Sequence, residues 1–524
     1  MTDVSIARRQ TLGLLLARTA RRYPDKPAVI CGETTWTYRE FDEISDRVAG
    51  ALVERGLKKG ERIAILARNS HAFVALRFAA ARMGAIIVPI NFMLKPDEIA
   101  FILRHSGARF FCTDTSMLEA ATAAAAGDGV AVDTLIWLPG EAHSEPAAGM
   151  ITFDELAAWS GDFSEDESLQ GSDTLQILYT SGTESAPKGA MLTHDAIIAE
   201  YVSCIASGGF EAADVVLHAL PLFHTAQLDA FFGPCVYLGS TNVIIGAPAP
   251  DVVVAKVEEH GVTSFFAPPT IWISLLRSPA FDAGRLATLK KGFYGASIMP
   301  VPVLKEIQQR LDGFLLWNFY GQTEIAPVAS MLMPEDQIRK AGSAGKAALN
   351  VELRLVDDDG NDVPTGEIGE IVSRSPQLMS GYYNDPEKTA AAFAGGWFHS
   401  GDLGIMDEDG YITVVDRKKD MIKTGGENVA SREVEETIYT LDGISEVAVI
   451  GLSDPYWVEA VTAIIVRKPD AIIDEAAVLA HCKERMAGYK VPKRVIFADN
   501  LPRNPSGKIL KRNLRQAYEK QAAE

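Results

Sequence analysis

Residues 179–189 read YTSGTESAPKG and follow the largely apolar run LQIL at residues 175–178. The stretch combines hydroxyl side chains, two glycines and the lysine Lys188. Hydroxyls, backbone N–H groups and an ammonium are donors that suit phosphate oxygens. It is not a Walker A loop, because Lys188 has neither a glycine before it nor a serine or threonine after it. Taken alone, the stretch is either a phosphate-binding loop or a polar turn after a strand, and the rest of the chain decides between the two.

Four further motifs follow in order along the chain. They are YGQTE at 320–324, SGD at 400–402, DRKKD at 416–420 with GGEN at 425–428, and NPSGK at 504–508. Together with residues 179–189, the series resembles the motifs of the adenylate-forming superfamily, which includes acyl-CoA synthetases, luciferases and peptide-synthetase adenylation domains. Taken alone, each of these residues would be interpreted as a turn, core or surface residue. Five motifs in one order favour the resemblance instead.

The resemblance implies a two-step reaction with ATP, Mg²⁺ and coenzyme A. A carboxylate attacks the α-phosphate of ATP to give an acyl-adenylate and pyrophosphate, and a thiol then displaces AMP. Charge builds on the phosphate in the first step, so the site needs preorganised donors and a metal ion. The function expected is therefore an AMP-forming acyl-CoA ligase. Transfer to a carrier-protein thiol and a non-catalytic nucleotide-binding protein are the alternatives.

By the same resemblance, the phosphate and metal contacts come from two motifs and the C-terminal lysine. Thr323 contacts the α-phosphate, Glu324 with Thr180 binds Mg²⁺, and Lys508 bridges the substrate carboxylate and the α-phosphate. The β- and γ-phosphates are held by Thr180, Ser181, Gly182, Thr183 and Lys188. Glu184 and Ser185 depart from the family's usual Thr and Gly, so we expect backbone N–H groups and Thr183, rather than side chain 184, to be the donors there.

The remaining nucleotide contacts implied by the resemblance lie further along the chain. Asp402 and Arg417 bind the ribose hydroxyls, and Lys419 is the pivot of a mobile lid. The adenine is expected among Gly295, Ala296, Ser297, Tyr320 and Gly321. The glycines of the GGEN motif, Gly425 and Gly426, are expected near CoA.

The acid is expected beside the segment PLFH at 221–224, which resembles the family motif at the mouth of the substrate pocket. The predicted pocket residues are His224, Gln227, Phe266 and Gln322. The neighbouring segments supply apolar side chains and neither Lys nor Arg, so a second carboxylate would be desolvated without a partner. We expect a medium-to-long-chain fatty acid. An aryl acid such as benzoate or a cinnamate is the alternative, because Gln227, Asp229 and His224 leave room for polar or aryl substituents.

The hydrophobic pattern predicts an α/β fold. Helical and strand-like stretches alternate over residues 39–113, as in βαβ units around a parallel sheet. Residues 351–415 read as short strands separated by turns, which predicts a small β-rich unit. A helix capped by Ser431 then begins a small α/β unit. We predict a large multi-subdomain N-terminal domain at 1–415, a hinge at 416–420 and a C-terminal lid at 421–524.

Composition excludes several other classes of protein. The 524 residues carry a net charge of −19, so the global field attracts neither nucleic acid nor an anionic membrane. Residues 482–515 are locally basic, but few aromatic side chains are interleaved, and ATP and CoA phosphates are the better-matched anions. Five widely spaced cysteines and the absence of a long apolar run indicate a reduced, cytoplasmic protein without a membrane span. A homodimer is left open.

Overall fold

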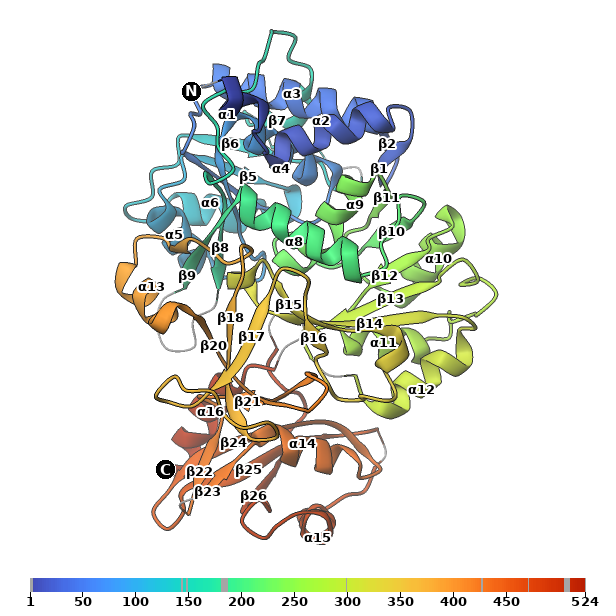
Figure 1. Cartoon of the computed structure of the whole chain (residues 1–524), viewed down its shortest axis with the longest axis vertical. Coiled ribbons are helices and arrows are strands. Elements are labelled where there is room, and N and C mark those ends of the chain that lie inside the picture. Colours follow the sequence, from blue (N-terminus) through green and yellow to red (C-terminus); the bar gives the residue numbers. More distant parts are fainter. Residues whose placement is uncertain are drawn as a thin grey trace. The chain divides into compact units, whose positions relative to one another are not determined.

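The computed structural model describes residues 3–142, 145–147, 149–180, 187–297, 299–425, 427–469, 471–503 and 509–523. They form two compact units, one of Met1–Glu352 with Arg374–Phe398 and one of Leu353–Ser373 with His399–Glu524 (Figure 1). The expected α/β class is confirmed in both units. No helix in these ranges is long and apolar enough to cross a membrane. All five cysteines are buried free thiols.

The first unit contains, in its described residues, an eight-stranded sheet in the order β19-β9-β8-β4-β3-β5-β6-β7. The strands from β8 to β7 run parallel, and β9 and β19 add antiparallel pairs at one edge. The strands are β3 (Arg62–Leu66), β4 (Ile86–Pro89), β5 (Phe110–Thr113), β6 (Thr134–Trp137), β7 (Ile151–Thr152), β8 (Thr174–Thr180), β9 (Lys188–Thr193) and β19 (Gly381–Tyr382). Successive parallel strands are connected by α4 (His71–Met83), α5 (Pro96–Ser106) and α6 (Leu118–Ala125).

A second sheet of this unit has nine strands in the described residues, in the order β16-β15-β14-β13-β12-β10-β11-β1-β2. The strands from β1 to β14 in this order run parallel. They are β1 (Pro27–Cys31), β2 (Thr34–Thr37), β10 (Val215–His218), β11 (Thr241–Ile244), β12 (Ser264–Phe266), β13 (Lys291–Gly295), β14 (Leu315–Gly321), β15 (Val328–Leu332) and β16 (Lys346–Ala347). The remaining helices of the unit are α1 (Asp3–Ala7), α2 (Leu12–Arg22), α3 (Tyr38–Glu54), α7 (Phe153–Ala157), α8 (His194–Ser207), α9 (Gly233–Leu238), α10 (Pro250–His260), α11 (Pro269–Arg277), α12 (Val301–Arg310) and α13 (Pro386–Ala392).

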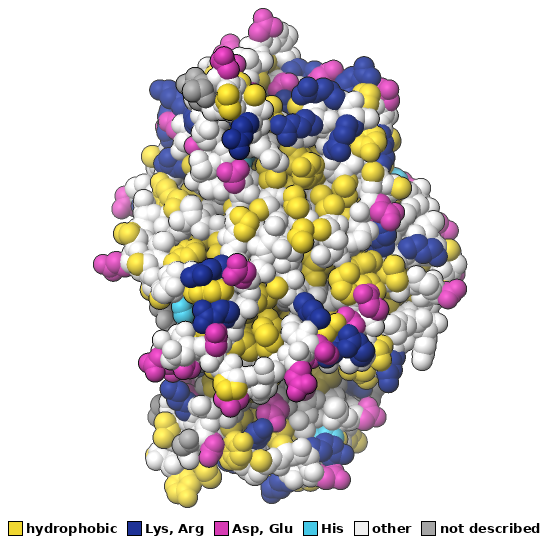
Figure 2. All heavy atoms as spheres, in the orientation of Figure 1, with side chains coloured by type: hydrophobic (Ala, Val, Ile, Leu, Met, Phe, Trp, Pro, Cys, Tyr) yellow, Lys and Arg dark blue, Asp and Glu magenta, His cyan; other side chains and the backbone are white. Residues whose placement is uncertain are grey.

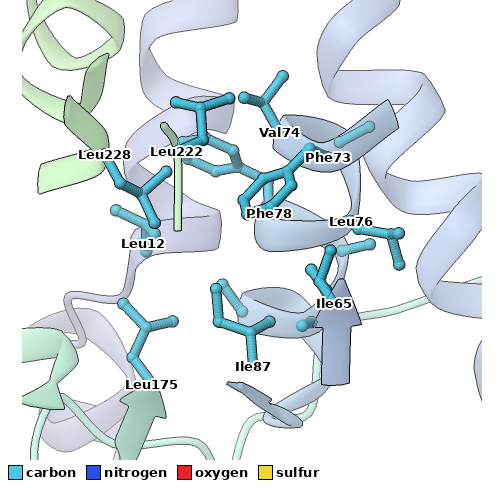
Figure 3. Packing of buried hydrophobic residues seen from close by; sticks show 14 of the residues in the cluster. Leu12, Ile65, Phe73, Val74, Leu76, Phe78, Ile87, Leu175, Leu222 and Leu228 are labelled. Carbon is cyan, nitrogen blue, oxygen red and sulfur yellow. The ribbon is translucent and has the colours of Figure 1, made fainter. Parts of the chain in front are cut away.

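Helix α4 lies at the centre of the main core of this unit. Every one of its residues is buried, as expected for a helix that is apolar on most sides. The helix begins at a Ser70 cap, whose hydroxyl accepts from the Phe73 N–H, and ends at Gly84 with φ 72°. Figure 3 shows its apolar side chains meeting residues of the flanking strands, helices and loops, among them Leu12, Ile65, Ile87, Leu175, Leu222 and Leu228.

The charge of the first unit is unevenly distributed over its surface. On the face shown in Figure 2, Lys and Arg side chains gather over α2 and α3 at the top of the view. Apolar side chains are exposed below them, over α8. Part of this face therefore carries a group of positive side chains, although the chain as a whole has a net negative charge.

The second unit contains two sheets in its described part. A four-stranded sheet has the order β17-β18-β20-β21, and the other has the order β23-β22-β25-β24 with β26 paired to β25. The strands are β17 (Glu352–Val356), β18 (Ile368–Arg374), β20 (Phe398–Met406), β21 (Ile412–Arg417), β22 (Ile422–Thr424), β23 (Glu427–Val429), β24 (Ile444–Asp454), β25 (Val458–Arg467) and β26 (Arg494–Phe497). The helices are α14 (Ser431–Tyr439), α15 (Glu475–Arg485) and α16 (Lys511–Ala523).

The small β-rich stretch predicted at 351–415 is therefore present as the four-stranded sheet. This sheet belongs to the same compact unit as the C-terminal residues, whereas the sequence predicts it to be part of the N-terminal domain. The position of the hinge at 416–420 stays a prediction.

Candidate active site

The two ends of the predicted phosphate loop are fixed by an antiparallel ladder. Thr180 ends β8 and Lys188 begins β9, and the two residues are paired across the ladder. The ammonium of Lys188 lies 5.0 Å from the centre of the Tyr382 ring. Ser181, Gly182, Thr183, Glu184 and Ser185 lie outside the described residues, so their expected phosphate contacts stay predictions.

The predicted metal carboxylate belongs to a short 3₁₀ turn, Thr323–Ile325. Glu324 is only 9% exposed, and its Oε1 accepts a 3.0 Å hydrogen bond from the Tyr382 hydroxyl. Its carbonyl oxygen accepts from the Met379 N–H at 2.8 Å. Burial and the neighbouring Glu324 raise the pKa of Tyr382, so the phenol stays protonated and donates.

The donors of this region fit a hard cation held together with a nucleotide. Glu324 supplies a carboxylate and Thr180 a hydroxyl, and Mg²⁺ is usually held by one or two carboxylates with phosphate oxygens. Within the described ranges, no group of three or more His, Cys, Asp or Glu could hold a metal ion without such a ligand.

The residues expected at the adenine meet at one sheet edge. Strands β13 and β14 run parallel, with Gly295 paired to Phe319, so residues 295–297 and 320–322 leave the same end of the sheet. A Cβ on Gly321 would come 1.9 Å from the Pro327 carbonyl oxygen, which explains a glycine there. Ala296 adopts a left-handed φ of 64°, and both Ala296 and Ser297 are exposed. Tyr320, Gln322 and Thr323 are half-buried at the same edge.

The ribose pair expected from the motifs is assembled within the second unit. Asp402 on β20 and Arg417 on β21 are register partners, and Arg417 Nε lies 3.3 Å from Asp402 Oδ1. Lys419 lies in the turn that follows β21, closed by a 2.8 Å bond from the Asp420 N–H to the Arg417 carbonyl. Gly425 has φ 59° and donates to the Trp457 carbonyl at 2.8 Å. Gly426 and Lys508 lie outside the described residues.

The segment that carries His224 is held by Asn69, a residue that sequence reasoning missed. Asn69 Oδ1 accepts from the Leu222 N–H at 2.8 Å, and its Nδ2 donates to the carbonyls of Leu220 at 2.8 Å and Ile245 at 3.1 Å. Asn69 lies just beyond the carboxyl end of the parallel strand β3. Ligand-binding loops gather at this end of a parallel sheet, so the position of Asn69 in the sequence could have indicated a role at the site.

His224 is half-buried, and its Nε2 atom is shielded from solvent. Burial lowers its pKa to about 4, so the imidazole is neutral at pH 7. In the described part of the chain, Nε2 has no hydrogen-bond partner. A buried polar atom without a hydrogen-bond partner indicates that a group of the ligand forms this hydrogen bond.

The two other polar residues expected beside the acid bond within the protein. Gln227 accepts from the Leu220 N–H at 3.2 Å, and its Nε2 lies 2.7 Å from His218 Nδ1. Asp229 forms a fully buried ion pair with Arg77. Both lie on a π-helix, Ala226–Phe232, an irregular helix type frequent at functional sites. A contact of Gln227 with the acid stays a prediction, and His224 is the better placed of the three residues.

An aromatic cluster joins this π-helix to the second sheet. Phe231 stacks on Phe266 at the end of β12, with ring centroids 4.1 Å apart and planes inclined by 14°. It also stacks on Phe319 of β14 at 5.4 Å and meets Phe293 of β13 edge-on at 5.1 Å. Phe266, predicted to line the pocket, is therefore part of a buried aromatic wall behind the strand ends that carry the expected adenine residues.

Comparisons with known proteins agree with this arrangement. Residues 16–383 match the family described as AMP-binding enzyme, and residues 433–508 match the AMP-binding enzyme C-terminal domain. The chain therefore belongs to the AMP-binding enzymes of the adenylate-forming superfamily, as its motifs indicate.

Similar proteins indicate which kind of AMP-binding enzyme the chain is. The chain is 37% identical over 511 residues to a feruloyl-CoA synthase of Amycolatopsis sp, covering 98% of this chain and 100% of that protein. It is 35% identical over 517 residues to a long-chain-fatty-acid–CoA ligase of Mycobacterium tuberculosis, covering 97% and 99%. The solved structure of the anthranilate CoA ligase AuaEII with anthranoyl-AMP is similar at a TM-score of 0.90 and 28% identity, covering 98% of both chains. The chain is an AMP-forming acid–thiol ligase.

Proposed function

We propose that this ligase activates a monocarboxylic acid of aryl-acid size with ATP and Mg²⁺, and then transfers the acyl group to CoA. The observation that carries the choice of acid is the cluster of stacked rings around Phe231. Aromatic faces recognise a flat aryl group by offset stacking or edge contact, worth about 0.5–1.5 kcal/mol per pair beyond buried area. The names of two relatives, feruloyl-CoA synthase and anthranilate CoA ligase, support the same class of acid.

The nucleotide roles proposed for the chain follow its motifs. Residues 180–183 and Lys188 hold the β- and γ-phosphates, Thr323 contacts the α-phosphate, and Glu324 with Thr180 holds Mg²⁺. When bound, Mg²⁺ polarises phosphoryl oxygens as a Lewis acid. Lys508 neutralises the charge that develops between carboxylate and α-phosphate. Fixed donors of this kind stabilise the transition state because they need no reorganisation.

At the acid, His224 offers one neutral hydrogen-bonding atom to the substrate. The Arg77 guanidinium is buried and bound to Asp229, so it is not available to pair with a second carboxylate on the substrate. Desolvating an unpaired carboxylate costs several kcal/mol, so dicarboxylic acids are poor substrates.

The test of the acid is kcat/KM for CoA-dependent AMP formation across acetate, hexanoate, dodecanoate, benzoate, coumarate and malonate. We expect benzoate or coumarate to be best. A malonate optimum would overturn the assignment of the pocket.

A matched pair of variants tests the aromatic wall. Phe231→Leu removes the ring that stacks on Phe266, whereas Phe314→Leu removes a buried ring that contacts Trp272 of α11. We expect Phe231→Leu to lower kcat/KM for the aryl acid about ten-fold relative to hexanoate, consistent with loss of one to two aromatic contacts. Phe314→Leu should leave that ratio unchanged.

A medium-to-long-chain fatty acid, the acid expected from the sequence, is the second candidate. It is favoured by the similarity to the mycobacterial long-chain-fatty-acid–CoA ligase. A dodecanoate optimum in the same panel would select it.

The thiol acceptor is tested separately from the acid. Pyrophosphate release on mixing enzyme, acid, ATP and Mg²⁺ reports adenylation, and AMP release on adding CoA reports the transfer step. Pyrophosphate release without CoA-dependent turnover would select carrier-protein loading, and no release with any acid would favour a nucleotide-binding protein without catalysis.

A further inference from the structure

Residues 377–383 connect the two parts of the candidate nucleotide site in the first unit. On one side, β19 pairs with β9 directly after the phosphate loop: the N–H groups of Ser380 and Tyr383 donate to the carbonyls of Met191 and Gly189 at 2.9 and 2.7 Å. On the other side, the Met379 N–H donates to the Glu324 carbonyl at 2.8 Å. This strap is therefore bonded by its backbone to both the phosphate-loop strand and the carboxylate turn.

Tyr382 on this strap contacts both chemical groups with one side chain. Its hydroxyl donates to Glu324 Oε1 at 3.0 Å, and its ring faces the Lys188 ammonium at 5.0 Å. Its own N–H donates to Thr389 Oγ1 at 2.9 Å, and the residue is only 7% exposed. The backbone of Tyr382 is thus held by a contact that involves neither Glu324 nor Lys188.

A buried network holds the start of β15, the strand that follows the carboxylate turn. The Gln377 side chain accepts from Ser203 Oγ at 2.6 Å, donates to the Val328 carbonyl at 3.0 Å and donates to Glu200. Glu200 Oε1 in turn accepts from the Val328 N–H at 3.2 Å. The backbone next to Glu324 is therefore anchored, and the Tyr382 hydroxyl restricts rotation of its carboxylate.

We propose that Tyr382 is a positioning residue that orients the Glu324 carboxylate for a divalent cation and sets its distance from Lys188. The inference rests on the proposed function, which gives Glu324 to Mg²⁺ and Lys188 to the phosphates. With Oε1 bound to the phenol, the second oxygen of the carboxylate is held in a defined direction for the cation. Partners of this kind fix the orientation of a metal ligand, and losing one typically costs 10–100-fold in metal affinity.

Tyr382→Phe tests the inference, because it removes the hydroxyl and keeps the ring over Lys188. The primary readout is the affinity for Mn²⁺, measured by electron paramagnetic resonance in the presence of ATP without acid. We expect the affinity to fall ~10-fold or more, within the range for loss of a ligand's hydrogen-bond partner. The Mg²⁺ concentration for half-maximal adenylation should rise by the same factor, with the KM for the acid unchanged.

Two further variants complete the comparison. Tyr383→Phe, at the next residue of the strap, removes a hydroxyl from a ring that packs against His105 and should bind Mn²⁺ as the wild type does. Tyr382→Leu also removes the ring from Lys188, so the KM for ATP should rise in addition. Melting temperatures of all variants show that the folded protein is being compared.

The outcomes separate the inference from the proposed function. If Glu324→Gln weakens Mn²⁺ binding and Tyr382→Phe does not, the positioning role of Tyr382 is overturned and the metal assignment stands. If Glu324→Gln leaves Mn²⁺ binding intact, the metal assignment itself is wrong, and the inference falls with it.

Discussion

Arg77 on α4 and Asp229 on the π-helix form an ion pair in which neither side chain has any exposed surface. Arg77 also donates to Gln176 Oε1 at 2.7 Å and to the Tyr201 hydroxyl at 3.1 Å, and Gln176 Nε2 donates to Asp229 Oδ2 at 2.7 Å. The π-helix begins two residues after His224, so this network fixes the element that leads out of the expected acid pocket.

Breaking this pair should destabilise the fold strongly. Asp229→Asn leaves the guanidinium buried without a counter-charge, which costs about 3–5 kcal/mol in buried pairs of this kind. The double variant Arg77→Met/Asp229→Leu removes both charges and should recover most of that loss. Urea unfolding measures the free energies, and a double variant no more stable than Asp229→Asn would contradict the argument.

Buried histidines should make the protein sensitive to acid. Burial lowers the pKa of His71, His194, His218 and His224 to about 4. In the unfolded chain these groups bind protons below about pH 6.5. The stability that they contribute is therefore present above pH 6.5 and is lost as the pH falls towards 4, by up to ~3 kcal/mol for each histidine.

His71→Phe tests this pH dependence at one position. The His71 ring meets Trp36 edge-on at 5.0 Å and Phe153 at 6.0 Å, and its Nδ1 has no partner within the described ranges. A phenyl ring should keep these contacts, so we expect equal or higher stability at pH 7.5 and a shallower loss between pH 6.5 and 4. Chemical unfolding across this range gives the slope, and an unchanged slope would show that His71 does not titrate on unfolding.

A strained residue at the β24–β25 turn offers a stabilising substitution. Val458 has φ 69° and is 69% exposed, so a β-branched side chain occupies the left-handed region with little burial in return. Val458→Gly should raise the free energy of unfolding by about 1 kcal/mol, because glycine adopts this conformation without strain. Val458→Ala keeps Cβ and should gain less, so thermal unfolding that ranks Ala above Gly would contradict the explanation.

Sequence periodicity predicted the first sheet well because each βαβ step is local. Local reasoning fails at Ser431. The sequence predicts it to be a helix cap, but it is the first residue of α14. Its hydroxyl donates to Asp416 at 2.6 Å and accepts from Lys511 at 2.5 Å. These partners are 15 and 80 residues away, so no local pattern reveals them.

The same limit applies to the candidate site. The motifs single out Glu324, Tyr320, Asp402 and Arg417 as candidate site residues, because those residue types carry the chemistry directly. Asn69 and Tyr382 act through contacts with residues 153 and 58 positions away, and Gln227 bonds within the interior instead of remaining free. Residues that hold others in place carry no chemical motif of their own, and tertiary structure is needed to find them.

Lys508 is predicted to act in the first half-reaction alone. In the proposed role its ammonium stabilises charge between the carboxylate and the α-phosphate, so Lys508→Ala should slow adenylation ~100-fold or more. Thiolysis of supplied acyl-adenylate should be largely spared. Arg512→Ala, which removes an exposed cation four residues further on, is the matched control and should leave both rates unchanged. Equal losses in both half-reactions of Lys508→Ala would refute the assignment.

Lys419 is predicted to be the pivot between the two half-reactions. It occupies the second central position of the turn closed between Arg417 and Asp420, and Asp420 is held by Arg515 at 2.9 Å. Proline fixes φ near −65°, so Lys419→Pro removes the backbone freedom that a hinge needs. We expect the variant to retain acyl-adenylate formation and to lose most CoA transfer, whereas Lys419→Ala, which keeps φ and ψ free, should retain both. Rapid-quench measurement of each half-reaction decides the point, since wild-type thioester formation by Lys419→Pro would place the pivot at another residue.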